Sequence, residues 1–339
     1  MNSKVKNILK YAAFIGMGLL LLWLAFRNED PVALWKNLTS ADYRWVLLSV
    51  LLGYSALMSR GYRWLILLEP LGYKPKLWNS INSVATLYLV NMAVPRAGEL
   101  ARCTSLNQVE DIPVDKLFGT VILERVIDFI MLFSIISFTF LMYVDEVIEF
   151  FKVAFDQNTG GGEDGSNILY YVFGFVVVVA IALMAFRNRI INHPKFEKIR
   201  SFWEGIKEGI KAIKTMKRKK AFIAHTLYIW LTYYLMVWVV FYAIEPTSEL
   251  NWADGFFVMV AASLGIVVPT PGGIGAYHYL VMLALGILGI DREDGLTYAT
   301  IVHSSQTLML MIAGALAFLF LYIQRRKPKH DATSADATE

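Results

Sequence analysis

Long apolar runs recur along the chain, and short polar segments separate them. Uninterrupted runs lie near residues 8–26, 43–68, 117–143, 167–186, 221–244 and 296–323. A helix of about 20 residues crosses the hydrocarbon region of a bilayer, so each run predicts one transmembrane helix. The pattern therefore predicts an all-α, polytopic integral membrane protein.

Two further apolar regions, 77–109 and 253–290, are each interrupted by a proline–glycine break, and counting them gives eight spans by hydropathy. The breaks read Pro95-Arg96-Ala97-Gly98-Glu99 and Pro269-Thr270-Pro271-Gly272-Gly273. Irregular backbone within a membrane is tolerated where it is buried in protein or lines a wet cavity. One break in each half predicts a binding site near the bilayer midplane, as in transporters.

The charges in the loops predict the orientation. The loop 187–220 carries twelve Lys and Arg against three acids, whereas the loop 144–166 carries six acids and one lysine. Lys and Arg concentrate on the cytoplasmic side, so the first loop is expected inside and the second outside. The lysine-rich N-terminus and the basic segment 325–327 are also expected in the cytoplasm.

The loops lie on these sides of the membrane if 77–109 and 253–290 are re-entrant hairpins, each of which enters and leaves the bilayer on the same side. The expected architecture is six full spans plus two re-entrant broken hairpins, in halves of about 1–143 and 167–323 that form an inverted repeat. The alternative is eight ordinary spans with prolines at helix ends, which would place the acidic loop in the cytoplasm.

Residues 1–323 are thus expected to form a single membrane domain. Within it, residues 194–217 show apolar positions at three- and four-residue steps among lysines. This segment is either an amphipathic helix on the cytoplasmic membrane surface or a basic loop that only sets the topology. The polar tail 324–339 is expected to be disordered and cytoplasmic.

Composition limits the chemistry. The chain is 56% hydrophobic and 18% charged, with a net charge of +4 and one cysteine. No histidines have metal-ligand spacing, and no glycine-rich nucleotide-binding loop occurs. We therefore expect no metal, no cofactor and no nucleic-acid partner, and the chain offers no catalytic constellation typical of an enzyme.

Charged residues inside apolar runs are candidate functional groups, because they are costly there. In the second span Arg63 is expected to extend to the interface, while the deeper Arg60 is expected to pair with an acid or a lipid phosphate. Glu124, Arg125 and Asp128 are expected to face the bundle interior and to pair across helices. They form either a structural ion-pair network or a gating or proton-relay group.

The first break contributes Arg96, Glu99 and Arg102, which with the N-terminal ends of the half-helices after Gly98 and Gly273 would bind an anion such as a phosphate. Glu99 would balance an arginine or contact a headgroup amine. His278, just after the second break, is either a hydrogen-bonded structural residue or a group whose titration is coupled to transport. The backbone of the second break would complete the site through Pro269, Pro271, Gly272, Gly273 and Gly275.

The chain resembles the transmembrane, flippase-like region of lysylphosphatidylglycerol synthases and its stand-alone relatives. The resemblance rests on residues 91–102, on Leu123-Glu124-Arg125-Val126-Ile127-Asp128, on 269–275 and on Arg63-Trp64 with Leu67-Leu68. It implies translocation or handling of polar lipids. Full-length synthases add an aminoacyl-transferase domain after this region. The present sequence ends at Glu339 without one, so synthase activity is expected to be absent. His278 stands where the family often has glutamate, so this chain departs from the family pattern at that position.

The sequence therefore predicts a bacterial inner-membrane flippase or scramblase for a phosphate-bearing lipid, either an anionic or a polyprenyl-type lipid. A membrane-embedded transferase or hydrolase acting on a lipid phosphate and a small-anion transporter are the alternatives. A further possibility is a non-transporting partner of a separately encoded lipid-modifying enzyme.

Overall fold

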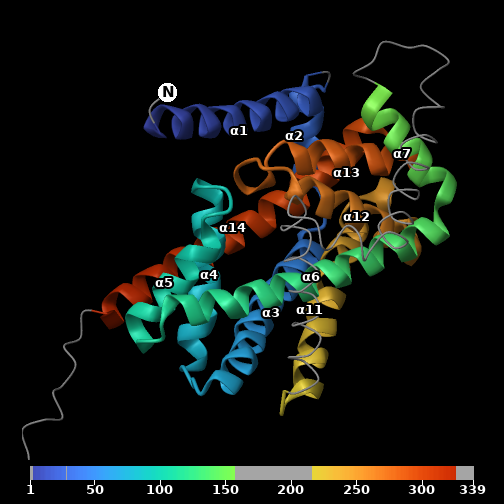
Figure 1. Ribbon diagram of the computed structural model, residues 1–339. Coiled ribbons are helices and arrows are strands. Elements are labelled where there is room, and N and C mark those ends of the chain that lie inside the picture. Colours follow the sequence, from blue (N-terminus) through green and yellow to red (C-terminus); the bar gives the residue numbers. More distant parts are fainter. Residues whose placement is uncertain (1–2, 28, 157–215, 326–339) are drawn as a thin grey trace, which may run out of the picture.

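The computed structural model describes residues 3–27, 29–156 and 216–325, and these residues form helices and no strand (Figure 1). The first part contains α1 (Ser3–Phe26), α2 (Pro31–Ser40), α3 (Tyr43–Leu68), η1 (Glu69–Leu71), α4 (Leu77–Ala93), α5 (Gly98–Glu110), α6 (Val114–Met142) and α7 (Val144–Asp156). The second contains α11 (Lys219–Trp238), η3 (Val239–Ala243), η4 (Glu245–Thr247), α12 (Trp252–Val267), η5 (Pro271–Gly273), α13 (Ala276–Ile287) and α14 (Arg292–Arg325).

The predicted all-α fold is confirmed, and the apolar runs coincide with helices. The run 43–68 is α3, 117–143 falls on α6, and 296–323 falls within α14. The predicted span 167–186, nearly all of the amphipathic segment 194–217 and the tail from 326 lie outside the described residues.

Two helices were not predicted. Asp30 caps α2 by accepting from the Val32 N–H at 2.9 Å, and Pro31 occupies its first turn. Residues 144–156, which were expected to belong to a loop, form α7. In α7 the partly buried Val147 and the buried Phe150 lie three residues apart and pack in one apolar cluster with residues of α12 and α13. The many acids of this segment obscured its amphipathic period.

By length and hydropathy, two described stretches, Lys219–Ala243 and Arg292–Arg325, are long enough to cross a membrane. The pair α6–α7, bent by 108°, adds a third if it counts as one span. Shorter apolar helices occur at Ala13–Phe26, Trp252–Val267 and Pro271–Ile287. The count of six spans and two hairpins and the inverted repeat stay predictions.

The first proline–glycine break joins α4 and α5 into a hairpin. Val94 is extended, as a residue before proline must be, and Arg96 has a positive φ of 67°. Glu110, at the end of α5, accepts from the Lys76 backbone N–H at 2.8 Å and from the Asn79 amide at 2.6 Å. Since these donors lie at the start of α4, the hairpin returns to the end from which it came.

The second break joins α12 and α13 through η5. Gly272, Gly273 and Gly275 have φ values of 60°, 79° and 82°, which only glycine adopts without strain. A Cβ at Gly265 near the end of α12 would lie 2.7 Å from the Tyr277 Cα, so the two half-helices pack backbone to backbone beside the break.

The two breaks lie next to each other. Pro95 and Pro271 line one small space, and a Cβ at Gly272 would lie 3.7 Å from the Met92 side chain. Helix α1 packs closely here as well, because a Cβ at Gly275 would lie 2.2 Å from the Gly18 carbonyl oxygen. The predicted meeting of the two tips is therefore present.

Helices α3 and α11 lie side by side and antiparallel (Figure 1). Ser49 Oγ donates to the Met236 carbonyl at 2.8 Å, and Ser59 Oγ lies 2.8 Å from His225 Nδ1. Helix α4 packs against α3 at Gly61 and against α14 at Gly314. This arrangement places α3 at the centre of the charged site described below.

We expect Gly98→Ala to weaken the first hairpin, because its Cβ would lie 2.2 Å from the Leu87 carbonyl oxygen. Overpacking of this kind costs about 1–3 kcal/mol. Gly119→Ala is the matched control, since a Cβ on that α6 residue meets nothing within 4 Å. Thermal unfolding in detergent should show a lower midpoint for the first variant only; equal midpoints would contradict the packing.

Candidate functional site: a buried arginine–carboxylate network

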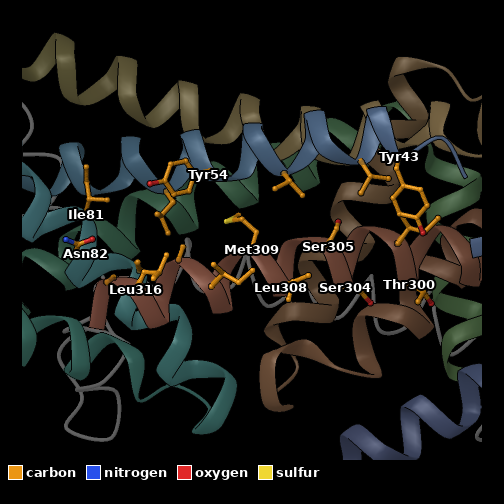
Figure 2. Close-up of a pocket in the computed structure, with 18 of the residues that line it drawn as sticks. Tyr43, Tyr54, Ile81, Asn82, Thr300, Ser304, Ser305, Leu308, Met309 and Leu316 are labelled. Atoms are coloured by element: carbon orange, nitrogen blue, oxygen red, sulfur yellow. The ribbon is translucent and has the colours of Figure 1, made fainter. Parts of the chain in front are cut away.

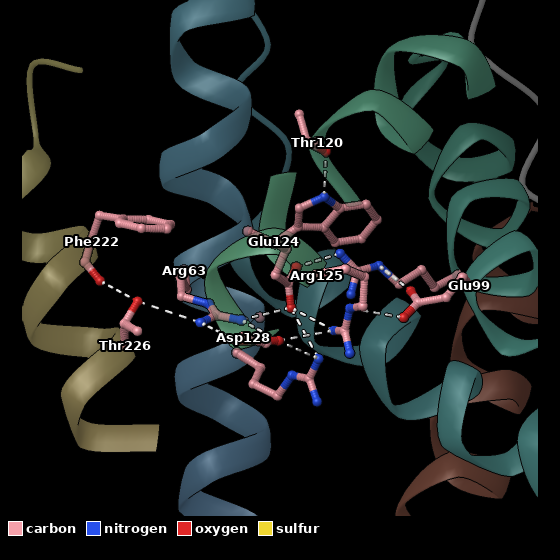
Figure 3. A network of polar contacts seen from close by, with 12 residues as sticks. Arg63, Glu99, Thr120, Glu124, Arg125, Asp128, Phe222 and Thr226 are labelled. Atoms are coloured by element: carbon pink, nitrogen blue, oxygen red, sulfur yellow. Dashed lines mark hydrogen bonds and ion pairs between the residues drawn. The ribbon is translucent and has the colours of Figure 1, made fainter. Parts of the chain in front are cut away.

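Seven ionisable side chains from α3, α5 and α6 meet in one network (Figure 3). They are Arg60 and Arg63 of α3, Glu99 and Arg102 of α5, and Glu124, Arg125 and Asp128 of α6. Helical spacing brings them together, because residues three or four apart share a face. From the sequence alone, the charged residues of the second span, of the run 117–143 and of the first break formed three separate groups. The network joins the first two groups completely, together with Glu99 and Arg102 of the third.

Glu124 is the centre of the network, and its side chain is fully buried. Its Oε1 accepts from the Nη2 atoms of Arg63 at 2.9 Å, Arg60 at 3.0 Å and Arg125 at 3.1 Å. Its Oε2 accepts from Arg102 Nη2 at 2.6 Å. One carboxylate therefore binds four guanidinium groups from three helices.

Two outer carboxylates complete the ion pairs. Asp128 binds Arg63 with both oxygens, at 2.8 and 3.1 Å, and lies 3.4 Å from Arg125 Nη2. Glu99 lies 3.2 Å from Arg125 Nε and 3.7 Å from Arg102 Nε. Because bidentate pairing fixes the plane of a guanidinium group, Arg63 is the most tightly oriented of these arginines.

Neutral side chains hold the arginines from the other side. Arg60 Nη1 donates to the hydroxyls of Tyr88 and, at 3.3 Å, of Tyr233, while Arg63 Nη1 donates to Thr226 Oγ1 at 3.4 Å. Tyr233 and Thr226 belong to α11, which joins the site in this way. Sequence reasoning missed all three residues, since a lone Tyr or Thr in an apolar run gives no signal.

Trp64 supports Arg102 through its ring. The guanidinium carbon of Arg102 lies 4.1 Å from the ring centroid, a cation–π geometry. The indole N–H of Trp64 donates to Thr120 Oγ1 at 2.9 Å, which fixes the ring against α6. Both Trp64 and Arg102 are fully buried.

The network carries an excess of positive charge. Its four arginines and three carboxylates give a formal charge of +1, and Arg125 is the member with the largest exposed fraction, 42% of its side chain. Among the described residues, Arg60 Nε, Arg63 Nε and both Nε and Nη1 of Arg102 are buried without a hydrogen-bond acceptor, whereas one acceptor of the network, Glu99 Oε2, is buried without a donor. Buried donors and unbalanced charge are costly, so the site favours a further negatively charged group.

The expectation that Arg63 extends to the interface is wrong: its side chain is fully buried and paired with Glu124 and Asp128. Two carboxylates on a facing helix outweigh the drive toward water. Arg60 does pair with an acid, and Glu124 and Asp128 do face inward and pair across helices, as the sequence predicted.

The predicted anion site at the tips is not assembled as expected. Arg96 is exposed and pairs with no described residue, whereas Arg102 is drawn into the network by Glu124. Asn91 Oδ1 accepts from the Gly98 N–H at 2.8 Å and so caps the first half-helix. The space between the tips is about 150 Å³ and is lined by Phe14, Ile15, Ala93, Val94, Pro95 and Pro271, which are apolar.

His278 lies behind the second break, 5% exposed, with its ring 4.8 Å from that of His303. His303 Nε2 lies 2.9 Å from the Gly272 carbonyl oxygen, which connects the pair to the break. His278 Nδ1 has no hydrogen-bond partner among the described residues. A role of His278 in transport stays a prediction. In the part of the chain described, no three His, Cys, Asp or Glu side chains gather as metal ligands.

Apolar helices surrounding a buried ionic network define an all-helical integral membrane protein. The family model of the lysylphosphatidylglycerol synthase transmembrane region matches residues 7–314, so the chain belongs to this family. The chain is also similar to the UPF0104 membrane protein MJ1078 of Methanocaldococcus jannaschii, with 22% identity over 251 residues that cover 71% of this chain and 98% of that protein. The resemblance inferred from the sequence motifs is confirmed.

We expect Arg63→Met to destabilise the protein by about 3–5 kcal/mol, because it removes the bidentate partner of Asp128 and one of the four arginines that surround the buried Glu124 carboxylate. Arg44→Met is the matched control on the same helix: its side chain is 91% exposed and pairs with Asp42, so its loss should cost less than about 1 kcal/mol. Denaturant unfolding in detergent measures both. Equal stability of the two variants would contradict a network that holds the helices together.

Proposed function

We propose that the protein moves a phosphate-bearing polar lipid across the bilayer and that the arginine network binds the headgroup phosphate. The observation that supports this most directly is the excess of guanidinium groups over carboxylates in a buried site. A phosphate oxygen would balance that charge by accepting from Arg125, the most exposed of the four arginines. Family membership supports a role connected with membrane lipids.

Arg125 is the residue through which a headgroup would enter. It is bound to Glu99, Glu124 and Asp128 at 3.1–3.4 Å, yet close to half of its side chain is open. An incoming phosphate would take Arg125 from these carboxylates without uncovering the buried Arg63 and Arg102. Arg125 would exchange the network carboxylates for the phosphate as its acceptors. This admits an anion at low cost, because each charge keeps an oppositely charged partner.

The proposal includes the orientation and location predicted from the loops: a bacterial inner membrane with both termini in the cytoplasm. It assigns no chemical step to the chain, so the transported lipid leaves unchanged. A membrane-embedded transferase or hydrolase would instead alter the lipid covalently, and a small-anion transporter would move phosphate without the lipid.

We expect Arg125→Gln to slow transbilayer movement of headgroup-labelled phosphatidylglycerol at least ten-fold, because the entering phosphate loses its accessible cation. The purified protein is reconstituted in vesicles, and the label reached by a membrane-impermeant quencher is followed in time. Arg218→Gln is the matched control, since Arg218 is 41% exposed and also paired, with Glu69, but lies outside the network. Its rate should equal that of the unmodified protein.

Equal rates for Arg125→Gln and the unmodified protein would remove the network as the headgroup site. Mass spectrometry of the same vesicles separates the other classes of protein. A lipid product of altered mass would favour the enzyme, and phosphate uptake without lipid movement would favour the small-anion transporter.

A further inference from the structure

A long groove runs along the bundle between α3, α4 and α14, with α2 at one end, and encloses about 1090 Å³. Figure 2 shows Tyr43 and Tyr54 of α3 on one side of it and Ser304, Leu308 and Leu316 of α14 on the other. Leu308 and Leu316 are 59% and 63% exposed, so the apolar wall of α14 is uncovered by the described residues.

The groove has the length of a bilayer core. Along α14 it is lined from Thr300 to Phe320, and 20 residues at 1.5 Å each give about 30 Å, equal to the hydrocarbon thickness of about 30 Å. Trp35 and Tyr43 line one end and Trp78 the other. Aromatic side chains of this kind concentrate at membrane interfaces, so the groove extends from one interface to the other.

The polarity of the groove changes along its length. None of the side chains that line it is charged, and the middle is lined chiefly by apolar residues, with Tyr54 among them. Toward one end stand Thr300, whose buried Oγ1 has no hydrogen-bond partner among the described residues, and the exposed Ser304, and toward the other end stands the partly exposed Asn82. Polar groups at the ends of an apolar groove suit a ligand that carries hydrogen-bonding atoms at the end of an apolar body.

The groove adjoins the arginine network. Leu57, Ala85 and Ala317 form a small buried cluster at the wall of the groove, and Tyr88 packs against it. The Tyr88 hydroxyl accepts from Arg60, which follows Leu57 by three residues, or about 4.5 Å along α3. The Tyr88 side chain thus lies between the apolar groove and the charged site.

We infer that this groove binds one acyl chain of a bilayer phospholipid. The chain lies along the uncharged middle, and the ester region meets Asn82 at one end or the hydroxyls of Thr300 and Ser304 at the other. The choice of a phospholipid rests on the proposed function; the binding of a hydrocarbon chain rests on the length, the absence of charge and the end groups of the groove itself.

The experiment fills the groove and measures bound lipid without measuring transport. Ala313→Trp places a large ring in the groove, and Ala315→Trp places the same ring on an exposed face of α14 outside it. Each protein is equilibrated with vesicles of phosphatidylglycerol that carries a diazirine in one acyl chain, extracted in mild detergent, irradiated and analysed by mass spectrometry. Thermal unfolding confirms that both variants are folded.

We expect the unmodified protein and Ala315→Trp to retain the same amount of probe, with label concentrated at Leu308, Ile312 and Leu316. Ala313→Trp should retain at least five-fold less. Equal retention in both variants, or label spread evenly onto the opposite face at Met311 and Phe318, would overturn the inference. So would disulfide formation between two copies of an Ile312→Cys variant, since a second chain would then occupy the groove.

The two proposals fail separately. Normal lipid retention with no transbilayer movement would reject the proposed transport and leave the acyl-chain site intact. Normal transport by a folded Ala313→Trp variant with unchanged retention would reject the acyl-chain site and leave the headgroup site intact.

Discussion

The burial of the Glu124 carboxylate is the constraint on which the arrangement of the first half depends. An isolated carboxylate in a low-dielectric interior is strongly disfavoured, so it must be surrounded by positive charge. Four arginines meet this requirement, and they come from α3, α5 and α6. Between helices within a bilayer the hydrophobic effect contributes little to association. The ion pairs therefore fix which helices are neighbours and in which register.

The broken hairpin is what allows α5 to reach this site. A continuous helix through residues 77–110 would carry Arg102 away from α6, whereas the turn at Pro95 and Gly98 sends α5 back beside α4. Arg102 then lies four residues beyond the tip, against Trp64 and Glu124. The break thus contributes to the network by turning the chain. At its own tip the Gly98 N–H is paired with Asn91, and the space beside it is lined by apolar residues.

Hydropathy located the helices well because the length and apolarity of a run can be read from the local sequence. Helix α3, for example, begins and ends where the pattern predicted. Hydropathy also located both breaks. The sequence-based expectation for Arg63 was wrong, because helical spacing tells which face of a helix a residue occupies but not which other helix covers that face. The separation of Arg96 from Arg102 was missed for the same reason. Tyr88 and Tyr233 acquire their role only when α4 and α11 are packed against α3.

A phospholipid that crosses a bilayer poses two physical problems, and the structure separates the parts that would address them. The headgroup needs charge in a medium where charge is costly, which a prepaired network supplies because its arginines are held by Glu124 before a ligand arrives. The chains need only an uncharged surface of bilayer length, which the groove along α14 supplies. Tyr88 touches both, with its ring against the groove wall and its hydroxyl on Arg60. A shift of α4 relative to α3 would therefore change the groove and the arginine contacts together, which under the proposed function would couple the position of the acyl chain to the state of the headgroup site.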